Sequence, residues 1–474
     1  ADPDIWWHLR NAEYQVLSHS FIVRDMYSFT AAGMPWINHE WLAELPFYFG
    51  WRLLRARGLY LVTLCAIEVI LLGVFRLACR KSESLRASVA VTAVASVLAT
   101  VSFGPRTLLF GWICLVAELL ILDRFFDARF FEDRFLKDER LIWALPPLFL
   151  LWVNTHGSWL IGMVLFTLFI LSGSFSLSLG AIENVAWTRS QRRKLAASWC
   201  LSLGALFVNP YGWRLVVYPF DLAFHQRLNI ANVQEWESLD FHSPRGRIFL
   251  GSLILFFLLQ LIRRRIWAPY ELAFLAVGVY SSFTYSRFLF LAGILVMPLM
   301  AKDLAGLGAC LRAARRLPSP DRPARNRPWL NAALLLILAL WAVHRFPRES
   351  RLMGSQSAKF PQTALQYLSG FHPRGNVFND YLWGGFLSWN TRQIPLLIDS
   401  RVDIFEYKGV LRDYLDATRL RNTLAVLDKY KIRYVLFAKD TPLVYFLSHT
   451  GSWKVDYQDH NTVLLERAAP GPLM

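Results

Sequence analysis

Residues 59–79 read LYLVTLCAIEVILLGVFRLAC and are followed directly by Arg80 and Lys81. A helix needs about 20 apolar residues to cross the hydrocarbon core of a bilayer. This run has that length, and its apolar residues are not confined to one face, as they are in a soluble amphipathic helix. The stretch therefore predicts a transmembrane helix that ends beside a basic loop.

Similar apolar runs recur along the chain, and we expect about ten spans. They fall at about 59–79, 87–103, 107–122, 142–154, 158–178, 195–208, 247–262, 270–284, 287–302 and 329–345. The composition agrees, because 55% of the 474 residues are hydrophobic and the mean hydropathy is +0.31. Soluble domains are about 45–50% apolar. The chain is therefore expected to be a polytopic membrane protein.

The basic residues indicate how the spans are oriented. They cluster in the connections 80–86, 123–141, 179–194, 263–269 and 303–328, which are every second connection. Cytoplasmic loops carry such an excess of Lys and Arg, so one topology places all five inside. The same pattern accounts for the net charge of +16, and we expect no nucleic-acid partner.

This topology divides the chain into three regions. Residues 1–58 form a first extracytoplasmic loop, with an interfacial helix from Trp41 to Leu54, and residues 59–345 form the transmembrane domain. In residues 346–474, short buried strands such as 395–398 and 434–437 alternate with helices, which predicts a small soluble α/β domain on the outer side. The fold class is mainly α. Because the chain begins in polar sequence that would lie outside, we also expect a leading transmembrane helix upstream.

The N-terminal loop concentrates reactive side chains near a membrane face. It contains the stretches Asp2-Pro3-Asp4-Ile5-Trp6-Trp7-His8 and Asn38-His39-Glu40-Trp41. A carboxylate there can act as general base toward a hydroxyl acceptor. Asp, His and Glu can also ligate a divalent ion, and tryptophans can stack on sugar rings. The alternative is an interfacial loop with belt tryptophans and solvated carboxylates.

Several residues on the same side carry two interpretations each. His156, between two spans, either faces a cavity or is a hydrogen-bonded residue of a tight turn. Arg287 and Arg106, each near the start of a span, either bind phosphate through the planar guanidinium fork or extend to the interface. Loop 209–246, which contains Glu235, either covers an outward cavity or is a surface loop. The pair Asp399–Arg401 is expected to tie a loop.

These motifs resemble those of bacterial membrane glycosyltransferases of the GT-C superfamily, in particular the group related to the dolichyl-phosphate-mannose protein mannosyltransferases. The motifs that carry the resemblance are Asp2 to His8, Phe29-Thr30 with Pro35-Trp36, His39 to Trp41, Asn154 to Gly157, Asn209 to Gly212, Arg287, Asn379 to Gly385 and Asp399 to Arg401. They extend over nearly the whole chain.

The resemblance implies transfer of a sugar from a polyprenyl-phosphate donor to an acceptor hydroxyl at the outer face of a bacterial inner membrane, with inversion. Its base is an Asp of the first extracytoplasmic loop, which makes Asp4 the first choice and Asp2 the second. The substrate-binding residues would be His8, Trp7, Glu40, His39, His156 and Arg287. Some members use a divalent metal and others do not, so a metal cofactor stays open. Membrane lipids and an unidentified acceptor are the expected partners, and the C-terminal domain would be periplasmic.

Two other functions are compatible with a membrane bundle. A non-catalytic subunit of the same fold could scaffold a complex with other membrane subunits. A transporter would require polar residues along several spans and breaks at paired positions, and the sequence has few of either.

Overall fold

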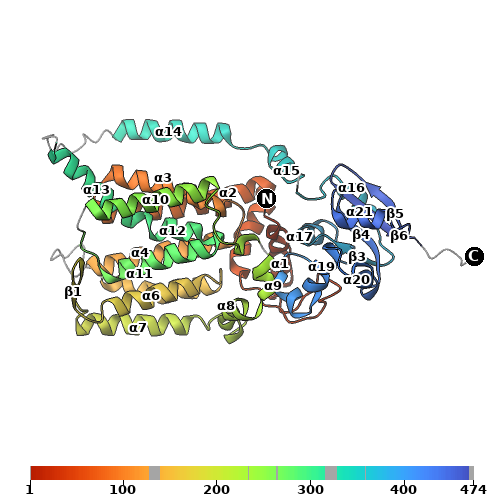
Figure 1. Ribbon diagram of the computed structural model, residues 1–474, viewed down its shortest axis with the longest axis horizontal. Helices are drawn as coiled ribbons and strands as arrows, with labels where there is room; N and C mark the ends of the chain where they lie inside the picture. Colours follow the sequence, from red (N-terminus) through yellow and green to blue (C-terminus); the bar gives the residue numbers. More distant parts are fainter. Residues whose placement is uncertain are drawn as a thin grey trace, which may run out of the picture.

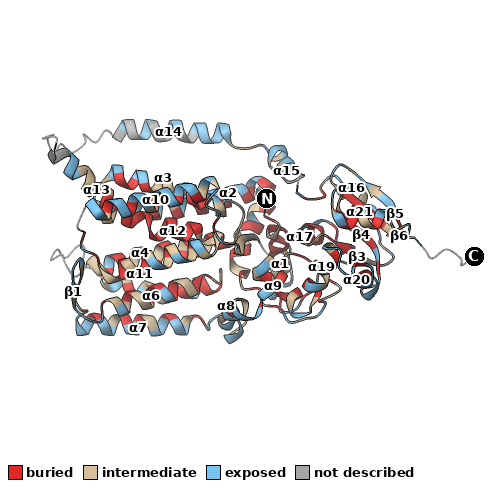
Figure 2. Ribbon diagram, viewed as in Figure 1, coloured by how far each residue is buried: buried red, intermediate tan, exposed pale blue. Residues whose placement is uncertain are grey.

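The computed structural model describes residues 2–127, 139–232, 234–262, 265–314, 328–357 and 359–468. A bundle of long helices occupies one end of an elongated molecule, and a mixed α/β region occupies the other (Figure 1). The N-terminal segment lies between them. Buried residues line the inner faces of the bundle helices and gather where the N-terminal segment meets the C-terminal region (Figure 2).

Each of the ten predicted spans coincides with one helix or with two or three consecutive helices. The helices are α2 (Trp41–Ser82), α3 (Leu85–Ala99) with η1 (Thr100–Ser102), α4 (Leu108–Asp127), η2 (Glu139–Ala144) with α5 (Leu145–Val153), α6 (Trp159–Ser172), α7 (Arg189–Ala205), α10 (Pro244–Ile262), α11 (Pro269–Thr284), η4 (Ser286–Phe288) with α12 (Leu289–Leu295) and α13 (Met297–Ala314), and α14 (Pro328–Arg345). A short hairpin of β1 (Leu177–Leu179) and β2 (Ile182–Asn184) joins α6 to α7.

Not all of these helices have the length and composition of a membrane span. Among the described residues, three do: Trp41–Ser82, Leu85–Ser102 and Pro244–Ile262. A fourth is possible if Ser286–Leu295 and Met297–Leu311, which are bent by 46°, form one span. Others are shorter as single helices, since α5 has 9 residues and α6 has 14. The mainly helical class is confirmed, while the number of spans is confirmed only in part.

Helix α2 contains two helices that meet at a sharp bend. Arg55 breaks the helical backbone with φ 52° and ψ −135°, so the predicted helix from Trp41 to Leu54 and the predicted span at 59–79 are separate arms. The arms touch closely at the bend, since a Cβ on Gly58 would lie 1.8 Å from the carbonyl oxygen of Gly50. Only glycine permits this approach.

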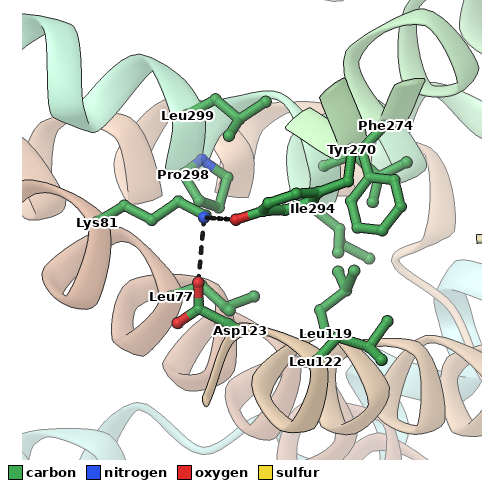
Figure 3. Close-up of a pocket in the computed structure, with 11 residues that line it drawn as sticks. Leu77, Lys81, Leu119, Leu122, Asp123, Tyr270, Phe274, Ile294, Pro298 and Leu299 are labelled. Atoms are coloured by element: carbon green, nitrogen blue, oxygen red, sulfur yellow. Dashed lines mark hydrogen bonds and ion pairs between the residues drawn. The ribbon is translucent and has the colours of Figure 1, made fainter. Parts of the chain in front are cut away.

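An ion-paired cluster ties the helices together at the bundle end far from the C-terminal region. Lys81 Nζ lies 3.0 Å from Asp123 Oδ1 and donates to the Tyr270 hydroxyl at 3.2 Å, so α2, α4 and α11 are joined beside a cavity of about 30 Å³ (Figure 3). The α2–α3 turn and the β1–β2 hairpin lie at this end (Figure 1). Residues 128–138, 263–264 and 315–327, with many of the predicted loop arginines and Pro318, Pro320 and Pro323 of connection 303–328, lie outside the described residues. The first part of that connection is helical and belongs to α13.

The C-terminal region contains a four-stranded sheet in the order β3-β4-β6-β5. Its strands are β3 (Asn376–Asn379), β4 (Ile432–Ala438), β5 (Trp453–Gln458) and β6 (Thr462–Arg467), and its helices are α15 (Glu349–Ser357), α16 (Leu365–Gly370), α17 (Tyr381–Asn390), α18 (Val402–Tyr407), α19 (Val410–Thr418), α20 (Thr423–Lys429) and α21 (Pro442–Ser448). Strands β3 and β4 are parallel, and the other pairs are antiparallel.

The predicted strand at 395–398 is wrong. Leu396 makes only isolated bridges, one to Val377 of β3 and one to Ser28 of the N-terminal segment. The backbone N–H of Phe29 donates to the Leu396 carbonyl at 3.0 Å. This apolar stretch is buried because the N-terminal segment covers it, rather than because it continues the sheet.

The N-terminal segment is thus packed against the C-terminal region. Its helix α1 (Asp4–Ser18) contacts α2 and α17. Trp6 of α1 makes edge-to-face contacts with Trp51 of α2, Phe360 and Phe386 of α17 at ring-centroid distances of 5.1–6.1 Å. Such aromatic pairs are favourable beyond their buried area, so this cluster holds the first residues of α1 between the other two regions.

Candidate functional site

Two adjoining cavities lie where the N-terminal segment, the bundle and the C-terminal region meet. Their volumes are about 460 and about 60 Å³, and both are lined by Asp4, Glu40, His156, Glu235 and Arg287. All of the predicted site residues line one or both cavities: Asp2, Asp4, Trp7, His8, His39, Glu40, His156 and Arg287. Residues that are far apart in sequence therefore share one polar space, while their chemical roles stay predictions.

Asp4 is the first residue of α1, and its carboxylate accepts a hydrogen bond from Trp7. Pro3 precedes it with φ −65°, a value already suited to a helix start. Trp7, one turn later, donates through Nε1 to Asp4 Oδ1 at 3.3 Å and to Ser400 Oγ at 3.1 Å. Burial and the nearby charge of Asp2 raise the pKa of Asp4 to about 7. A carboxylate of that pKa suits a general base near neutral pH.

Glu40 is the centre of a histidine cluster. It lies just before α2, where the helix dipole favours a negative charge. Its Oε1 is 3.2 Å from His156 Nε2 and 3.7 Å from His39 Nε2, and its Oε2 is 3.6 Å from His8 Nε2. Burial alone would raise the pKa of Glu40, but the charges of His39 and His8 lower it to about 2. Glu40 is therefore ionised at neutral pH.

His8 links this cluster to a second buried carboxylate. Its Nδ1 lies 2.8 Å from Glu44 Oε1, and Asn11 Nδ2 donates to the same oxygen at 2.9 Å. Burial lowers the pKa of His8, but the hydrogen bond to Glu44 and the charge of Glu40 outweigh burial and raise it. His8 is positioned because it follows Asp4 by one helical turn on the same face of α1.

His156 both accepts a hydrogen bond within a tight turn and faces the cavity, so both interpretations of this residue hold. Its Nδ1 accepts the backbone N–H of Ser158 at 2.9 Å within the turn between α5 and α6, and its Nε2 faces Glu40 in the cavity. Burial lowers the pKa of His156 to about 3. The imidazole is therefore neutral, with its Nε2 at 3.2 Å from Glu40 Oε1.

Arg287 also lines both cavities. It belongs to η4, and its guanidinium lies 4.4 Å from the ring centre of Trp236. Its buried Nε has no hydrogen-bond partner within the described residues. An arginine stays charged in proteins. A buried cation with an unused donor suits an anionic group such as phosphate.

A network around Arg401 fixes the C-terminal part of the site. Its Nη2 lies 2.7 Å from Asp25 Oδ1 and 2.6 Å from Asp399 Oδ2. The predicted Asp399–Arg401 tie is confirmed, and it extends to the N-terminal segment. Burial raises the pKa of Asp25, but the charge of Arg401 outweighs it and the net pKa is lowered. The network places Ser400 beside Trp7 and hence near Asp4.

The structure adds site residues that the sequence analysis left open or missed. Arg106 makes ion pairs with Asp2 and with Glu235 of η3 (Gln234–Trp236), so these residues close one side of the smaller cavity. Tyr218 and Asp403 line the larger cavity, where the Tyr218 hydroxyl donates to Asp403 Oδ2 at 3.1 Å. The position of Arg106 near the start of a span pointed to it in the sequence, whereas no sequence pattern pointed to Tyr218.

A divalent metal at this site would need several His, Cys, Asp or Glu side chains around one point. Within the residues that the structure describes, no group of three or more His, Cys, Asp or Glu is placed to hold a metal ion. Asp2 and Glu235 are ion-paired with Arg106, whose positive charge lies where a cation would have to bind. The arrangement does not fit a metal.

No protein-family model and no curated protein sequence matches the chain. Its structure is similar to an oligosaccharyltransferase from Archaeoglobus fulgidus in the apo form, with a TM-score of 0.56 and 12% identity over 92% of this chain and 66% of that one. It is also similar to ArnT from Cupriavidus metallidurans bound to undecaprenyl phosphate, with a TM-score of 0.52 and 14% identity over 98% of this chain and 94% of that one. The same archaeal enzyme in complex with Zn and sulfate has a TM-score of 0.51 and 11% identity, over 98% of this chain and 69% of that one.

These neighbours are GT-C membrane glycosyltransferases, so the resemblance stated from the motifs is confirmed at the level of the fold. The chain spans just under two thirds of the length of the apo oligosaccharyltransferase. It spans nearly all of ArnT.

Proposed function

We propose that this protein is an integral membrane glycosyltransferase that transfers a sugar from a polyprenyl-phosphate donor to an acceptor hydroxyl, with inversion. The observation that carries the proposal is that Asp4, with a pKa of about 7, and Arg287, with an unpaired buried Nε, line the same cavity. One is a base poised at neutral pH and the other is an anion site. The undecaprenyl phosphate bound to ArnT, which has the same fold, supports a lipid phosphate as donor.

The geometry suggests a role for each charged group in this reaction. Asp4 takes the proton of the acceptor hydroxyl while the hydroxyl oxygen attacks the anomeric carbon. The bond from that carbon to the phosphate oxygen breaks, and its electron pair leaves with the lipid phosphate. Arg287 stabilises the negative charge that develops there, as pre-placed cations do in other group transfers. Attack opposite the leaving group inverts the anomeric carbon.

The remaining predicted residues are suited to holding the sugar. Trp7 and His39 supply ring faces for stacking, and Glu40 and His156 supply an acceptor and a neutral imidazole for hydroxyl groups. His8 acts on the sugar indirectly. It contacts the carboxylates of Glu40 and Glu44 and so orients both.

Helix α8 (Trp213–His225) favours a donor that reaches the cavity from lipid. Trp213, Val217, Phe220 and Phe224 are exposed, and their spacing of four, three and four residues places them on one helical face. Leu222, on the same helix, lines the cavity. An exposed apolar face is typical of a helix that lies in a membrane interface, so we place α8 there.

In this proposal the bundle spans a bacterial inner membrane about ten times, with the five basic connections in the cytoplasm. The cavity, residues 1–58 and residues 346–474 then lie in the periplasm. This placement follows from the excess of Lys and Arg in alternate connections.

Replacement of Asp4 tests the proposal. Asp4→Asn should lower release of polyprenyl phosphate from undecaprenyl-phosphate sugars by about 10²–10⁴-fold, the range for loss of a general base. Glu13→Gln is the matched control, because Glu13 lies on the same helix outside both cavities. Unchanged turnover of a folded Asp4→Asn variant would remove Asp4 from the role. A wild-type protein without turnover on any such donor would favour the scaffolding subunit.

A further inference from the structure

Arg106 holds together two acidic side chains from distant parts of the chain. It lies in the loop before α4, and its Nε pairs with Asp2 Oδ2 while its Nη2 pairs with Glu235 Oε1. Its side chain is 25% exposed and that of Asp2 is 6% exposed. All three residues line the smaller cavity together with Asp4.

This position is where a divalent cation would find oxygen ligands. Such cations need several carboxylate or carbonyl oxygens within about 2.0–2.6 Å. One carboxylate oxygen of Asp2 and one of Glu235 already contact guanidinium nitrogens, and an arginine between two carboxylates cannot lose its proton. Burial lowers the pKa of Arg106, but the charges of Asp2 and Glu235 outweigh it and raise the pKa further above its ordinary value.

The other acidic side chains of the two cavities do not complete a metal site either. Asp4 Oδ1 accepts a hydrogen bond from Trp7, and Asp403 Oδ2 accepts one from Tyr218. Glu40 faces three histidines, but within the described residues no three such groups are placed to hold a metal ion. The oligosaccharyltransferase from Archaeoglobus fulgidus, whose fold is similar, has a structure in complex with Zn and sulfate. Here a cationic side chain lies between the carboxylates instead.

We infer that Arg106 is a built-in cation that replaces a divalent metal between Asp2 and Glu235, so that sugar transfer needs no metal. That sugar transfer needs no metal rests on the proposed function. That Arg106 excludes a metal from Asp2 and Glu235 does not. Arg106 acts as a positioning residue. It neutralises Asp2 beside the base and joins the N-terminal segment to loop 209–246 across the site.

The inference predicts that removal of the guanidinium creates a metal site. In Arg106→Gln, the carboxylates of Asp2 and Glu235 become free, and we expect one Mn²⁺ to bind at micromolar concentration in electron paramagnetic resonance titrations of the purified full-length protein. Wild type should bind no Mn²⁺ below the millimolar range. The double variant Arg106→Gln with Glu235→Gln should lose the new site, and Arg247→Gln, an exposed arginine of α10, should behave as wild type.

Turnover gives a second readout. Wild type should keep its rate in excess EDTA, whereas Arg106→Gln should fall by at least about tenfold, equivalent to 1.4 kcal/mol in the barrier, and regain activity with Mn²⁺. Tight Mn²⁺ binding by wild type, or loss of wild-type turnover in EDTA, would overturn the inference. A folded Arg106→Gln variant without a Mn²⁺ site would also overturn it.

If Arg106→Gln does not fold, the wild-type Mn²⁺ titration and the variant Arg106→Lys still test the inference. Lysine keeps a cation there, so that variant should bind no Mn²⁺ and should work in EDTA. Failure of the proposed function has a different signature, because a protein with no turnover on any donor would still show the Mn²⁺ binding differences.

Discussion

Neutralising Asp2 should make the protein active at lower pH. Burial is the main reason that the pKa of Asp4 rises from 3.8 to about 7, and the charge of Asp2 is the second. A neighbouring like charge shifts a carboxyl pKa by about one unit or more, which corresponds to about 1.4 kcal/mol. Asp2→Asn also removes one of the two carboxylates that Arg106 neutralises, so the guanidinium acts more strongly on Asp4. Both effects lower the pKa of Asp4.

The sign follows from the role of Asp4 as a base. Only the ionised carboxylate accepts the proton, so kcat/KM should fall as the pH drops through the pKa of Asp4. The pH at which kcat/KM falls to half of its plateau should be near 7 for wild type and about 6 for Asp2→Asn. At pH 6 about a tenth of the wild-type base is ionised and about half of the variant base, so the variant should keep roughly fivefold more of its own plateau rate.

The assay is kcat/KM for polyprenyl phosphate release between pH 5 and 9, each variant being scaled to its own plateau. Glu13→Gln, on the same helix, removes a carboxylate that pairs with Arg10 and Arg392 and should leave the midpoint unchanged. An acid limb of Asp2→Asn that coincides with wild type, or moves upward, would refute the electrostatic coupling of Asp2 and Asp4.

Three further predictions test donor binding, the junction with the C-terminal region and the topology. Arg287→Ala should raise KM for the lipid donor by about tenfold or more, since a hydrogen bond to a charged group contributes about 1.5–3 kcal/mol; Arg247→Ala is the control, and an unchanged KM would leave Arg287 without a role in donor binding. Arg401→Lys keeps the charge but not the bidentate fork, and should destabilise the protein by about 3 kcal/mol; an unaltered Tm would contradict a structural role for that network. In a cysteine-free background, a membrane-impermeant maleimide added outside should label His449→Cys and not Leu85→Cys, and the reverse labelling would overturn the proposed orientation.

Local sequence patterns predicted much of the helical architecture. The ten apolar runs all became helices, because a continuous apolar segment buries its backbone polar groups most simply as a helix. Helix α1 (Asp4–Ser18) was not predicted, because residues 1–58 were expected to form a loop whose one helix began at Trp41. The bend at Arg55 separates the two helices predicted on either side of it. Which helices are long enough to span a membrane depended on where each helix ends, and single sequences locate such boundaries poorly.

The prediction at 395–398 failed for a different reason. A short apolar run between polar residues indicates burial but does not identify the partner that buries it. In the structure this partner is the N-terminal segment, about 370 residues away in the chain, since Phe29 and Thr30 bond to the carbonyls of Leu396 and Leu397.

The sequence by itself determined that this chain is a mainly helical, strongly apolar protein with a cluster of acids, histidines and tryptophans near its N-terminus, because these properties depend on composition and on neighbours within one or two turns. Only the tertiary structure decided which charges meet. Arg106, Glu235 and Ser400 join Asp2 and Asp4 through contacts across more than a hundred residues, and electrostatic energies depend on distance and burial, which no local pattern specifies.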